Sequence, residues 1–180
     1  GGVIVDLCCG TGRLSQHILK HVAPGSCVLG LDFSKSMLER AANKKIAEKR
    51  NRCQIDAWQN NAEVGAHNVG FILADAAHLP FKNECIDCIG ISFSLRNLAY
   101  RNPKAEMHLR EVVRALRSKG KFVCVETSQP TRRLLRVLYH LYLQRVVPLV
   151  GWIVSGRKGA YQYLGISATN FPSAEEIVDM

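Results

Sequence analysis

A chain of 180 residues has the length of one domain, and 47% hydrophobic residues exclude a chain too polar to form a core. Twenty-four Lys and Arg residues against 15 Asp and Glu give a net charge of +9. This excess leaves open a nucleic acid, an anionic membrane, an acidic substrate, or simply a basic soluble protein. The chain opens at Gly1 inside a predicted strand, so we expect it to be a piece of a longer protein.

The segments alternate between apolar runs typical of strands and amphipathic runs typical of helices. Predicted strands cover residues 2–7, 27–31, 69–75, 85–93 and 119–127, and predicted helices cover 14–21, 35–50 and 103–118. The helix at 103–118 places Leu109, Val112, Val113 and Leu116 on one apolar face. Residues 51–68 are irregular or weakly helical. Strands that alternate with helices predict an α/β fold with a mostly parallel, twisted sheet and helices on both of its faces.

After Pro130 the sequence "TRRLLRVLYHLYLQRVVPLVGWIV" predicts a long apolar helix. One narrow stripe of this helix contains Arg132, Arg133, Arg136, His140 and Gln144. Arg145 interrupts the apolar run, so we interpret the segment as something other than a transmembrane span. Either it packs on the core or part of its face meets lipid or a greasy ligand. We predict one domain over 1–180 with a helical, substrate-side insertion at about 131–170.

Seven cysteines, an odd number, lie mostly in apolar stretches, which favours a reducing compartment and buried thiols. Cys85 and Cys88 form a C-x-x-C, but no second pair has metal-ligand spacing. Cys8 and Cys9 adjoin a tight turn that needs small residues. We therefore predict no metal and no disulfide among these four cysteines.

Potential ligand-binding residues follow several predicted strands. The first strand contains Asp6 and runs into Gly10-Thr11-Gly12; Asp32, Asp75-Ala76 and Ser92 follow at the ends of later strands. Open α/β sheets bind ligands at the carboxyl ends of their strands, and a carboxylate about twenty residues after a glycine turn is the expected ribose acceptor. This series predicts a nucleoside-containing ligand.

Ser15 stands where a dinucleotide-binding turn requires its third glycine, which favours S-adenosylmethionine over NAD. In this hypothesis Asp6 binds the ammonium group, while Gly10 and Gly12 let the backbone approach the ligand. Asp32 accepts the ribose hydroxyls. Adenine is bound by Asp75 and the Ala76 N–H, with Phe33 stacking on the ring or belonging to the core.

The segments "VDLCCGTG", "LDFSKSML", "ADAAHLPFKNECIDCI", "ISFSLRNL", "VETSQP", "YQYL" and "FPSAEE" resemble successive motifs of the UbiE/MenG family, the class I methyltransferases that C-methylate quinone precursors. The resemblance covers essentially the whole chain. It implies a Rossmann-like fold and cofactor contacts at Thr11, Asp32, Asp75, Ala76 and Ser92. It also implies that leading helices and closing strands of the family are absent from these 180 residues.

Several positions depart from the family pattern, chiefly on the side where the resemblance implies quinol recognition. Arg13 stands where the family often has an acidic residue, and Tyr139-His140 replaces a Tyr-Asp pair. The other departures are Arg157, Lys158, Ile166 and Thr169. These changes leave the cofactor motifs intact, but they leave open whether activity is lost or redirected.

The resemblance implies a prenylated quinol, methylated at a ring carbon, as the substrate. Arg96 is predicted to stabilise phenolate charge with Asn97 beside it, and His140 is a candidate proton acceptor alongside Tyr139, Tyr142 and Tyr161. Alternatives are a methyltransferase for another small molecule or for RNA, and a non-catalytic S-adenosylmethionine-binding member of a quinone-synthesis complex. We expect a cytoplasmic or organellar-matrix protein with peripheral membrane contact and no nucleic-acid partner; a homodimer is left open.

Overall fold

The computed structural model describes residues 1–46, 69–127, 129–156 and 158–171. The chain divides into two compact units, Gly1–Val125 and Glu126–Met180, which are described separately below. The predicted irregular segment at 51–68 lies outside the described residues.

The first unit is built on a five-stranded sheet in which all neighbouring strands are parallel. Its strands are β1 (Val3–Leu7), β2 (Cys27–Asp32), β3 (Val69–Leu73), β4 (Ile86–Ser92) and β5 (Leu116–Val125), in the order β3-β2-β1-β4-β5. This confirms the α/β class and the strands expected from the apolar runs.

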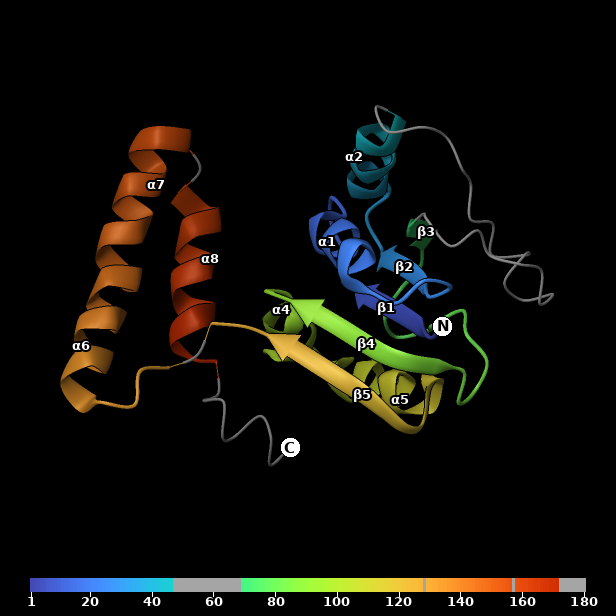
Figure 1. Cartoon of the computed structure of the whole chain (residues 1–180). Helices are drawn as coiled ribbons and strands as arrows, with labels where there is room; N and C mark the ends of the chain where they lie inside the picture. Colours follow the sequence, from blue (N-terminus) through green and yellow to red (C-terminus); the bar gives the residue numbers. More distant parts are fainter. Residues whose placement is uncertain (47–68, 128, 157, 172–180) are drawn as a thin grey trace. The chain divides into compact units, whose positions relative to one another are not determined.

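Two sets of helices flank this sheet (Figure 1). The helices α1 (Arg13–His21) and α2 (Lys35–Ile46) contact β1, β2 and β3, whereas α5 (Ala105–Ala115) contacts β5 and the short α4 (Leu95–Ala99). Right-handed crossovers cause this separation, because the chain moves in one direction through β1, β2 and β3 and in the opposite direction from β4 to β5. The order therefore reverses between β1 and β4.

The core is formed by the central strands and part of β3, whereas the end strand β5 is largely exposed. Every residue of β2 is buried, and Ile86, Ile89 and Ile91 of β4 are at most 1% exposed. Parallel strands covered on both faces read as continuous apolar runs, which is why the sequence reveals them. In β5, by contrast, Phe122 and Val123 are 37% and 47% exposed.

The sequence prediction was wrong at three places in the first unit. The helix α4 was not predicted, because five residues are too few to display a helical period. Val113 was assigned to the apolar face of α5, but it is 71% exposed, whereas Val112 is buried. Because β5 begins at Leu116, that residue belongs to the strand rather than to the helix.

The second unit is helical, as predicted for about 131–170. A continuous helix runs through α6 (Arg133–Leu141), the π-helical turn η1 (Tyr142–Val146) and α7 (Val147–Ser155), and it packs against α8 (Lys158–Thr169). Pro148 has no N–H and its ring would collide with a carbonyl one turn earlier, so the wider π turn accommodates it.

Two glycines let these helices approach closely. A Cβ atom on Gly151 would lie 2.3 Å from the ring of Tyr161, and one on Gly165 would lie 2.5 Å from the carbonyl oxygen of Leu143. Neither separation is possible between real atoms, so any larger residue would push α8 away from the helix α6–α7.

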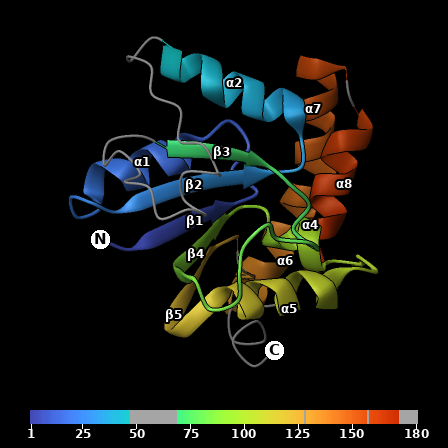
Figure 2. The same ribbon diagram turned by 90° about the vertical axis from the view of Figure 1, so that its right-hand side faces the viewer.

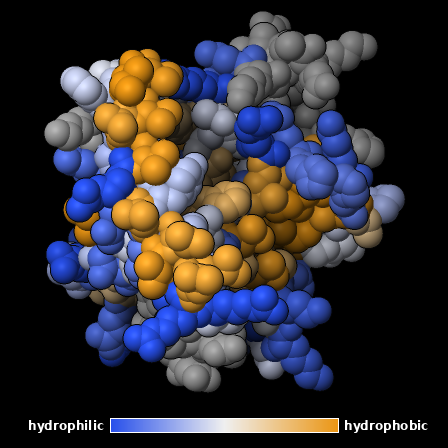
Figure 3. Space-filling view, turned by 90° about the vertical axis from the view of Figure 1, so that its left-hand side faces the viewer, coloured by the Kyte–Doolittle hydropathy of each residue, from blue (hydrophilic) through white to orange (hydrophobic). Residues whose placement is uncertain are grey.

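Most apolar side chains of α6 and α7 are exposed. No residue of α6 is buried, and in α7 only Pro148 and Gly151 are. Within the helix Arg133–Ser155 an 18-residue stretch has a mean hydropathy of 1.3 and is 17% buried, so the helix is long and apolar enough to cross a membrane. Arg145 therefore does not by itself exclude a span. Length and composition do not establish one either, because core helices of soluble proteins share them. Figure 3 shows orange, hydrophobic side chains gathered at the surface.

Candidate functional site

The glycine turn at 8–12 leaves β1 where the strand order reverses, and in Figure 2 the chain can be followed from β1 into α1. Two backbone N–H groups fix it to β2: that of Cys9 donates to the Leu31 carbonyl (2.9 Å), and that of Gly10 donates to Asp32 Oδ2 (2.8 Å). Open α/β sheets bind their ligands at this point of reversal. The turn is therefore held where a ligand is expected.

Gly10 and Gly12 both adopt positive φ angles, of 54° and 69°, but for different reasons. A Cβ on Gly12 would collide with the Phe71 ring at 2.6 Å, so this glycine is required by packing. A Cβ on Gly10 would meet no atom within 4 Å. The open space beside the Gly10 backbone fits a ligand such as S-adenosylmethionine, and Thr11, between the two glycines, is half-buried.

Asp32 anchors the turn and is itself 6% exposed. Its Oδ2 accepts from Gly10, and its Oδ1 accepts from the Ser34 N–H at 2.8 Å. Each carboxylate oxygen keeps a second acceptor site, so the predicted ribose contact requires these remaining lone pairs. The neighbouring Phe33 is 77% exposed, which rules out the core alternative and leaves its ring available for stacking.

Asp6 is 1% exposed, and its Oδ2 accepts a 2.5 Å hydrogen bond from the Ser15 hydroxyl. Burial raises the pKa of Asp6 to about 6, while the Ser15 hydroxyl lowers it. The predicted direct contact with a ligand ammonium group is not what this geometry provides, because the carboxyl group is enclosed. Ser15, identified in the sequence only as a missing glycine, is its buried partner.

The thiols in the turn are poor nucleophiles. Burial raises the pKa of Cys8 to about 12 and raises that of Cys9 as well, and the carboxylates of Asp32 and Asp6 add to both effects. The cysteines of the described ranges, Cys8, Cys9, Cys27, Cys85, Cys88 and Cys124, are free thiols, and no group of three potential metal ligands occurs in those ranges.

Asp75 lies two residues beyond β3, and about half of its side chain is exposed. Its Oδ1 accepts from the Ala77 N–H (2.9 Å), and its Oδ2 accepts from Lys104 Nζ (3.1 Å). These bonds lower the pKa of Asp75, the Ala77 N–H most strongly. Asp75 therefore remains ionised, but adenine would share it with Lys104. Ala76 is 6% exposed.

The carboxyl end of β4 leads directly into the predicted catalytic residues. Ser92 is half-buried at the last position of the strand, and Arg96 lies in α4 with 8% exposure. Arg96 is therefore not an ordinary, solvent-exposed surface arginine. Asn97 is exposed within α4, whose N-cap is Ser94, so it is not a capping residue.

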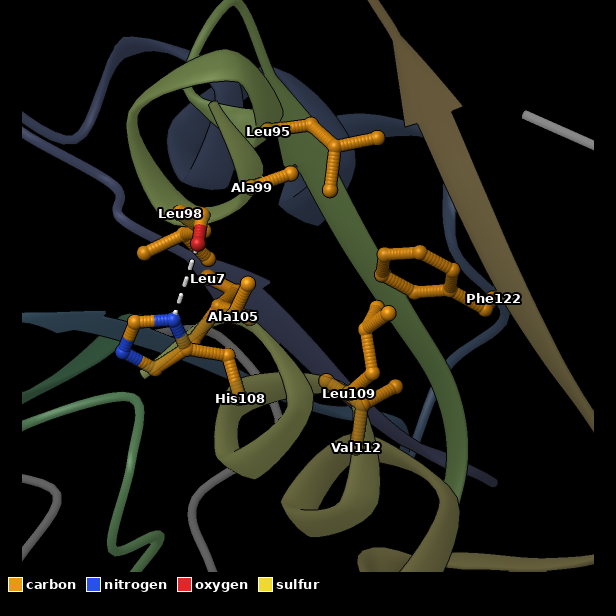
Figure 4. A pocket seen from close by; sticks show the side chains of 9 residues that line it. All are labelled: Leu7, Leu95, Leu98, Ala99, Ala105, His108, Leu109, Val112 and Phe122. Atoms are coloured by element: carbon orange, nitrogen blue, oxygen red, sulfur yellow. Dashed lines mark hydrogen bonds between the residues drawn. The ribbon is translucent and has the colours of Figure 1, made fainter. Parts of the chain in front are cut away.

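An apolar pocket lies beneath α4 (Figure 4) and is lined by Leu7, Leu95, Leu98, Ala99, Ala105, His108, Leu109, Val112 and Phe122. None of the predicted cofactor residues lines it, and His108 is its only polar member. The His108 Nδ1 lies 3.1 Å from the Leu98 carbonyl, and Nε2 lies 3.9 Å from Asp75 Oδ1. This buried histidine connects α4 with Asp75, and the pocket is a packing seam rather than the cofactor site.

His140 belongs to the second unit, where its Nε2 lies 2.8 Å from Gln129 Oε1. The Gln129 amide nitrogen donates to the carbonyls of Ala168 (2.7 Å) and Thr169 (3.1 Å), which fixes Oε1 as an acceptor. Neutral His140 therefore carries its proton on Nε2, and only Nδ1 could act as a base. Its role as a proton acceptor stays a prediction.

Of the other residues that depart from the family pattern, Arg13 begins α1 in the first unit, and the rest lie in the second unit. Ile166 is 51% exposed, and the Thr169 hydroxyl donates to the Gly165 carbonyl one turn earlier. Arg157 and the side chain of Lys158 lie outside the described part of the chain.

Sequence reasoning missed the residues that support the site from a distance. In the first unit Lys104, the N-cap of α5, and His108 within α5 reach Asp75; within the second unit Gln129 reaches the end of α8. Their sequence separations of 29 to 40 residues leave no local signal. Phe93, which ends the predicted strand at 85–93, has a φ of 53° between β4 and α4, and the sequence did not indicate this conformation.

The all-parallel sheet, the glycine turn at the point of reversal and the acidic end of β2 define the Rossmann-like fold of class I S-adenosylmethionine-dependent methyltransferases. The chain is similar to the solved PH0226 protein of Pyrococcus horikoshii, with a TM-score of 0.51, 27% identity, and coverage of 77% of this chain and 50% of that one. It also resembles the fold of a SAM-dependent methyltransferase from Aquifex aeolicus, with a TM-score of 0.55, 17% identity, and coverage of 73% and 60%.

The chain belongs to the ubiE/COQ5 methyltransferase family, whose model matches residues 1–180. It is 33% identical over 177 residues to the demethylmenaquinone methyltransferase of Lactococcus lactis, covering 98% of this chain and 62% of that protein. It is 34% identical over 180 residues to the same enzyme of Staphylococcus aureus, covering 100% and 66%. The chain thus spans about two thirds of these relatives. The cofactor that the family implies is S-adenosylmethionine.

Proposed function

We propose that this chain is the cofactor-binding part of a C-methyltransferase that methylates a prenylated hydroquinone. The observation that carries the proposal is the open Gly10 backbone, held by Asp32 beside the exposed Phe33 at the reversal of the strand order. The name of the relatives, demethylmenaquinone methyltransferase, supports a quinone-type acceptor.

S-adenosylmethionine supplies a methyl group on a sulfonium, which a nucleophile can take in an in-line displacement. A hydroquinone ring carbon becomes nucleophilic when a neighbouring hydroxyl loses its proton; after methyl transfer, with S-adenosylhomocysteine as the leaving group, the same carbon would release its hydrogen as a proton. Arg96 would stabilise the phenolate through its guanidinium, with Asn97 as its exposed neighbour in α4. Asp32 and Phe33 would hold the adenosine and so fix the distance between donor and acceptor.

The test is methyl transfer by the complete protein from labelled S-adenosylmethionine to a panel of demethylated naphthoquinols, benzoquinols, unrelated small metabolites and RNA. We expect label on a quinol ring carbon. Arg96→Ala should lower kcat by about 10² to 10³, as expected for a lost stabiliser of developing negative charge, while the affinity for S-adenosylhomocysteine changes little.

Arg101→Ala is the matched control, since this residue follows α4 and lies over the Tyr100 ring at 5.3 Å. It should leave kcat unchanged. Label on another metabolite or on RNA would overturn the quinol acceptor and leave a methyltransferase of different substrate. Cofactor binding without transfer to any acceptor would indicate a non-catalytic member of an assembly.

We also propose peripheral contact between the second unit and an anionic membrane, which places the protein on the cytoplasmic or matrix side. From Thr127 to Ala174 the sequence contains no Asp or Glu, whereas it contains Arg132, Arg133, Arg136, Arg145, Arg157 and Lys158. The exposed apolar side chains of α6 and α7 lie on the same helix as Arg133, Arg136 and Arg145, and Arg132 is its N-cap. Positive charge next to exposed apolar surface fits an anionic bilayer.

Co-sedimentation with vesicles tests this contact. Replacing Arg132, Arg133 and Arg136 with Gln should weaken binding to anionic vesicles, at roughly 1 kcal/mol per arginine, and added salt should do the same. The control replaces three exposed lysines of the first unit with Gln, namely Lys20, Lys35 and Lys82. It has the same net charge as the triple arginine variant. Equal loss with both triple variants, or binding unaffected by either, would contradict the proposed surface.

A further inference from the structure

Phe93 combines two features that are each unfavourable for a folded chain. Its backbone has a φ of 53°, in the left-handed region, and its side chain is 59% exposed. Bulky side chains rarely adopt positive φ. Within the described residues the other non-glycine positions with positive φ are Cys8, Glu84, Arg101 and Lys119, so Phe93 is the only aromatic among them.

The surrounding structure holds Phe93 in this conformation. Its N–H donates to the Val125 carbonyl at the end of β5 (2.8 Å), and it lies between Ile91, 1% exposed, and Leu95, 5% exposed. The chain leaves β4 and enters α4 between these buried anchors. Strained backbone that is fixed by its surroundings occurs preferentially at ligand and active sites.

The strand order places Phe93 on one side of the glycine turn and Phe33 on the other. Phe33 follows β2 and Phe93 follows β4, and these strands are the two neighbours of β1. In the proposed function the adenosine is bound on the side of β2 and β3, by Asp32 and Asp75. Phe93 therefore follows β4 on the opposite side of the turn, one residue before the N-cap of α4 and three residues before Arg96.

We propose that Phe93 is an acceptor-contacting residue whose exposed ring forms one wall of the site for a planar aromatic acceptor. The proposal rests on the proposed function, since it places the methyl donor between Phe33 and Phe93. Aromatic rings pack in offset-stacked or edge-to-face geometry, so a phenyl wall would hold a quinol ring in orientation and discriminate against acceptors without a ring. With this left-handed backbone the ring remains 59% exposed.

The decisive variant is Phe93→Gly in the complete protein, because glycine adopts positive φ without strain. For an acceptor-contacting residue, stability and binding should move in opposite directions. We expect the Tm to rise by about 2–4 °C, because glycine relieves the backbone strain at this position. Binding of 1,4-naphthoquinone, titrated in the presence of S-adenosylhomocysteine, should weaken by about tenfold. Phe93→Tyr should retain binding.

Lys119→Gly is the matched control, since Lys119 is exposed and has a φ of 67°. It lies in the first half of β5, away from the carboxyl ends of the strands. It should raise the Tm similarly and leave naphthoquinone binding unchanged. A lower Tm in Phe93→Gly would show that the ring packs against another part of the protein and would overturn the inference. Equal naphthoquinone binding by Phe93→Gly and wild type would overturn the role of Phe93 and leave the proposed function standing. A wild type that binds S-adenosylhomocysteine but no aromatic acceptor would overturn it together with the proposed quinol substrate.

Discussion

The two units of this chain use apolar residues in opposite ways. In Gly1–Val125 the apolar strands are enclosed: 0% of the surface is exposed at Val5, Leu7, Val28 and Ile89. In Glu126–Met180 the apolar helix α6–α7 exposes residues such as Ile153 and Val154 at 69% and 78%. The sheet unit thus buries its own core, whereas the helical unit presents surface that is suited to a ligand or a membrane.

The largest expected effect tests this contrast with one residue type. Ile89→Ala should lower the free energy of unfolding by about 2–5 kcal/mol, because it opens a cavity in the sheet core. Ile153→Ala should change it by less than about 0.5 kcal/mol. Urea denaturation of both variants provides the measurement, and a comparable loss in Ile153→Ala would show that α7 is buried in the protein.

The next effect comes from the charge enclosed in the sheet unit. Since the pKa of Asp6 rises from 3.8 to about 6 on folding, the folded state holds the proton more tightly between these values, and stability falls as pH increases through them. Above pH 6 the cost is about 3 kcal/mol. Asp6→Asn should therefore be more stable than wild type at pH 8, with the advantage disappearing at pH 4.

Thermal unfolding across this pH range measures the difference between Asp6→Asn and wild type. Ser15→Ala provides the opposite perturbation, because it removes the hydroxyl that lowers the pKa of Asp6. It should lose stability most at pH 8. A constant difference between Asp6→Asn and wild type at every pH would contradict the enclosed carboxyl group.

Asp32 and Asp87 lie at opposite ends of the same sheet, and we expect Asp32 to affect cofactor binding and Asp87 to affect stability. Asp32→Ala should weaken S-adenosylhomocysteine binding by about 1.5–3 kcal/mol per lost hydrogen bond to the carboxylate. Asp87 accepts from the Val3 N–H (2.6 Å) at the start of β1 and pairs with Arg117. Asp87→Ala should lower stability but keep affinity, as measured by calorimetry. Equal affinities in both variants would refute the assignment of Asp32.

The smallest effect concerns the helical unit. Gln129→Ala removes the amide that joins His140 to the carbonyls at the end of α8, and it should cost about 1 kcal/mol. Faster hydrogen exchange in the last turn of α8 would show this loss, and ¹⁵N spectra of wild type should show His140 protonated at Nε2. Gln162→Ala, at an exposed position of α8, is the control. Unchanged exchange in Gln129→Ala would contradict the clamp.

The sequence predicted the strands well because buried parallel strands are continuous apolar runs, and the bounds of β1, β2 and β4 differ by one or two residues from those expected. It also located the turn and the acidic strand ends. It could not predict that Asp6 is enclosed by Ser15 or that Asp75 is shared with Lys104. Those pairings depend on which elements pack together, whereas sequence periodicity reports only on one element at a time.

The Asp32 carboxylate accepts hydrogen bonds from the backbone N–H groups of both Gly10 and Ser34. These two N–H groups therefore report on whether the cofactor site is occupied. Any ribose that shares the carboxylate alters the acceptor strength felt by both protons at once. Their resonances should therefore shift together on titration, at the same midpoint, and their solvent-exchange rates should change in parallel. Occupancy of the site can thus be followed without a labelled ligand or a catalytic assay.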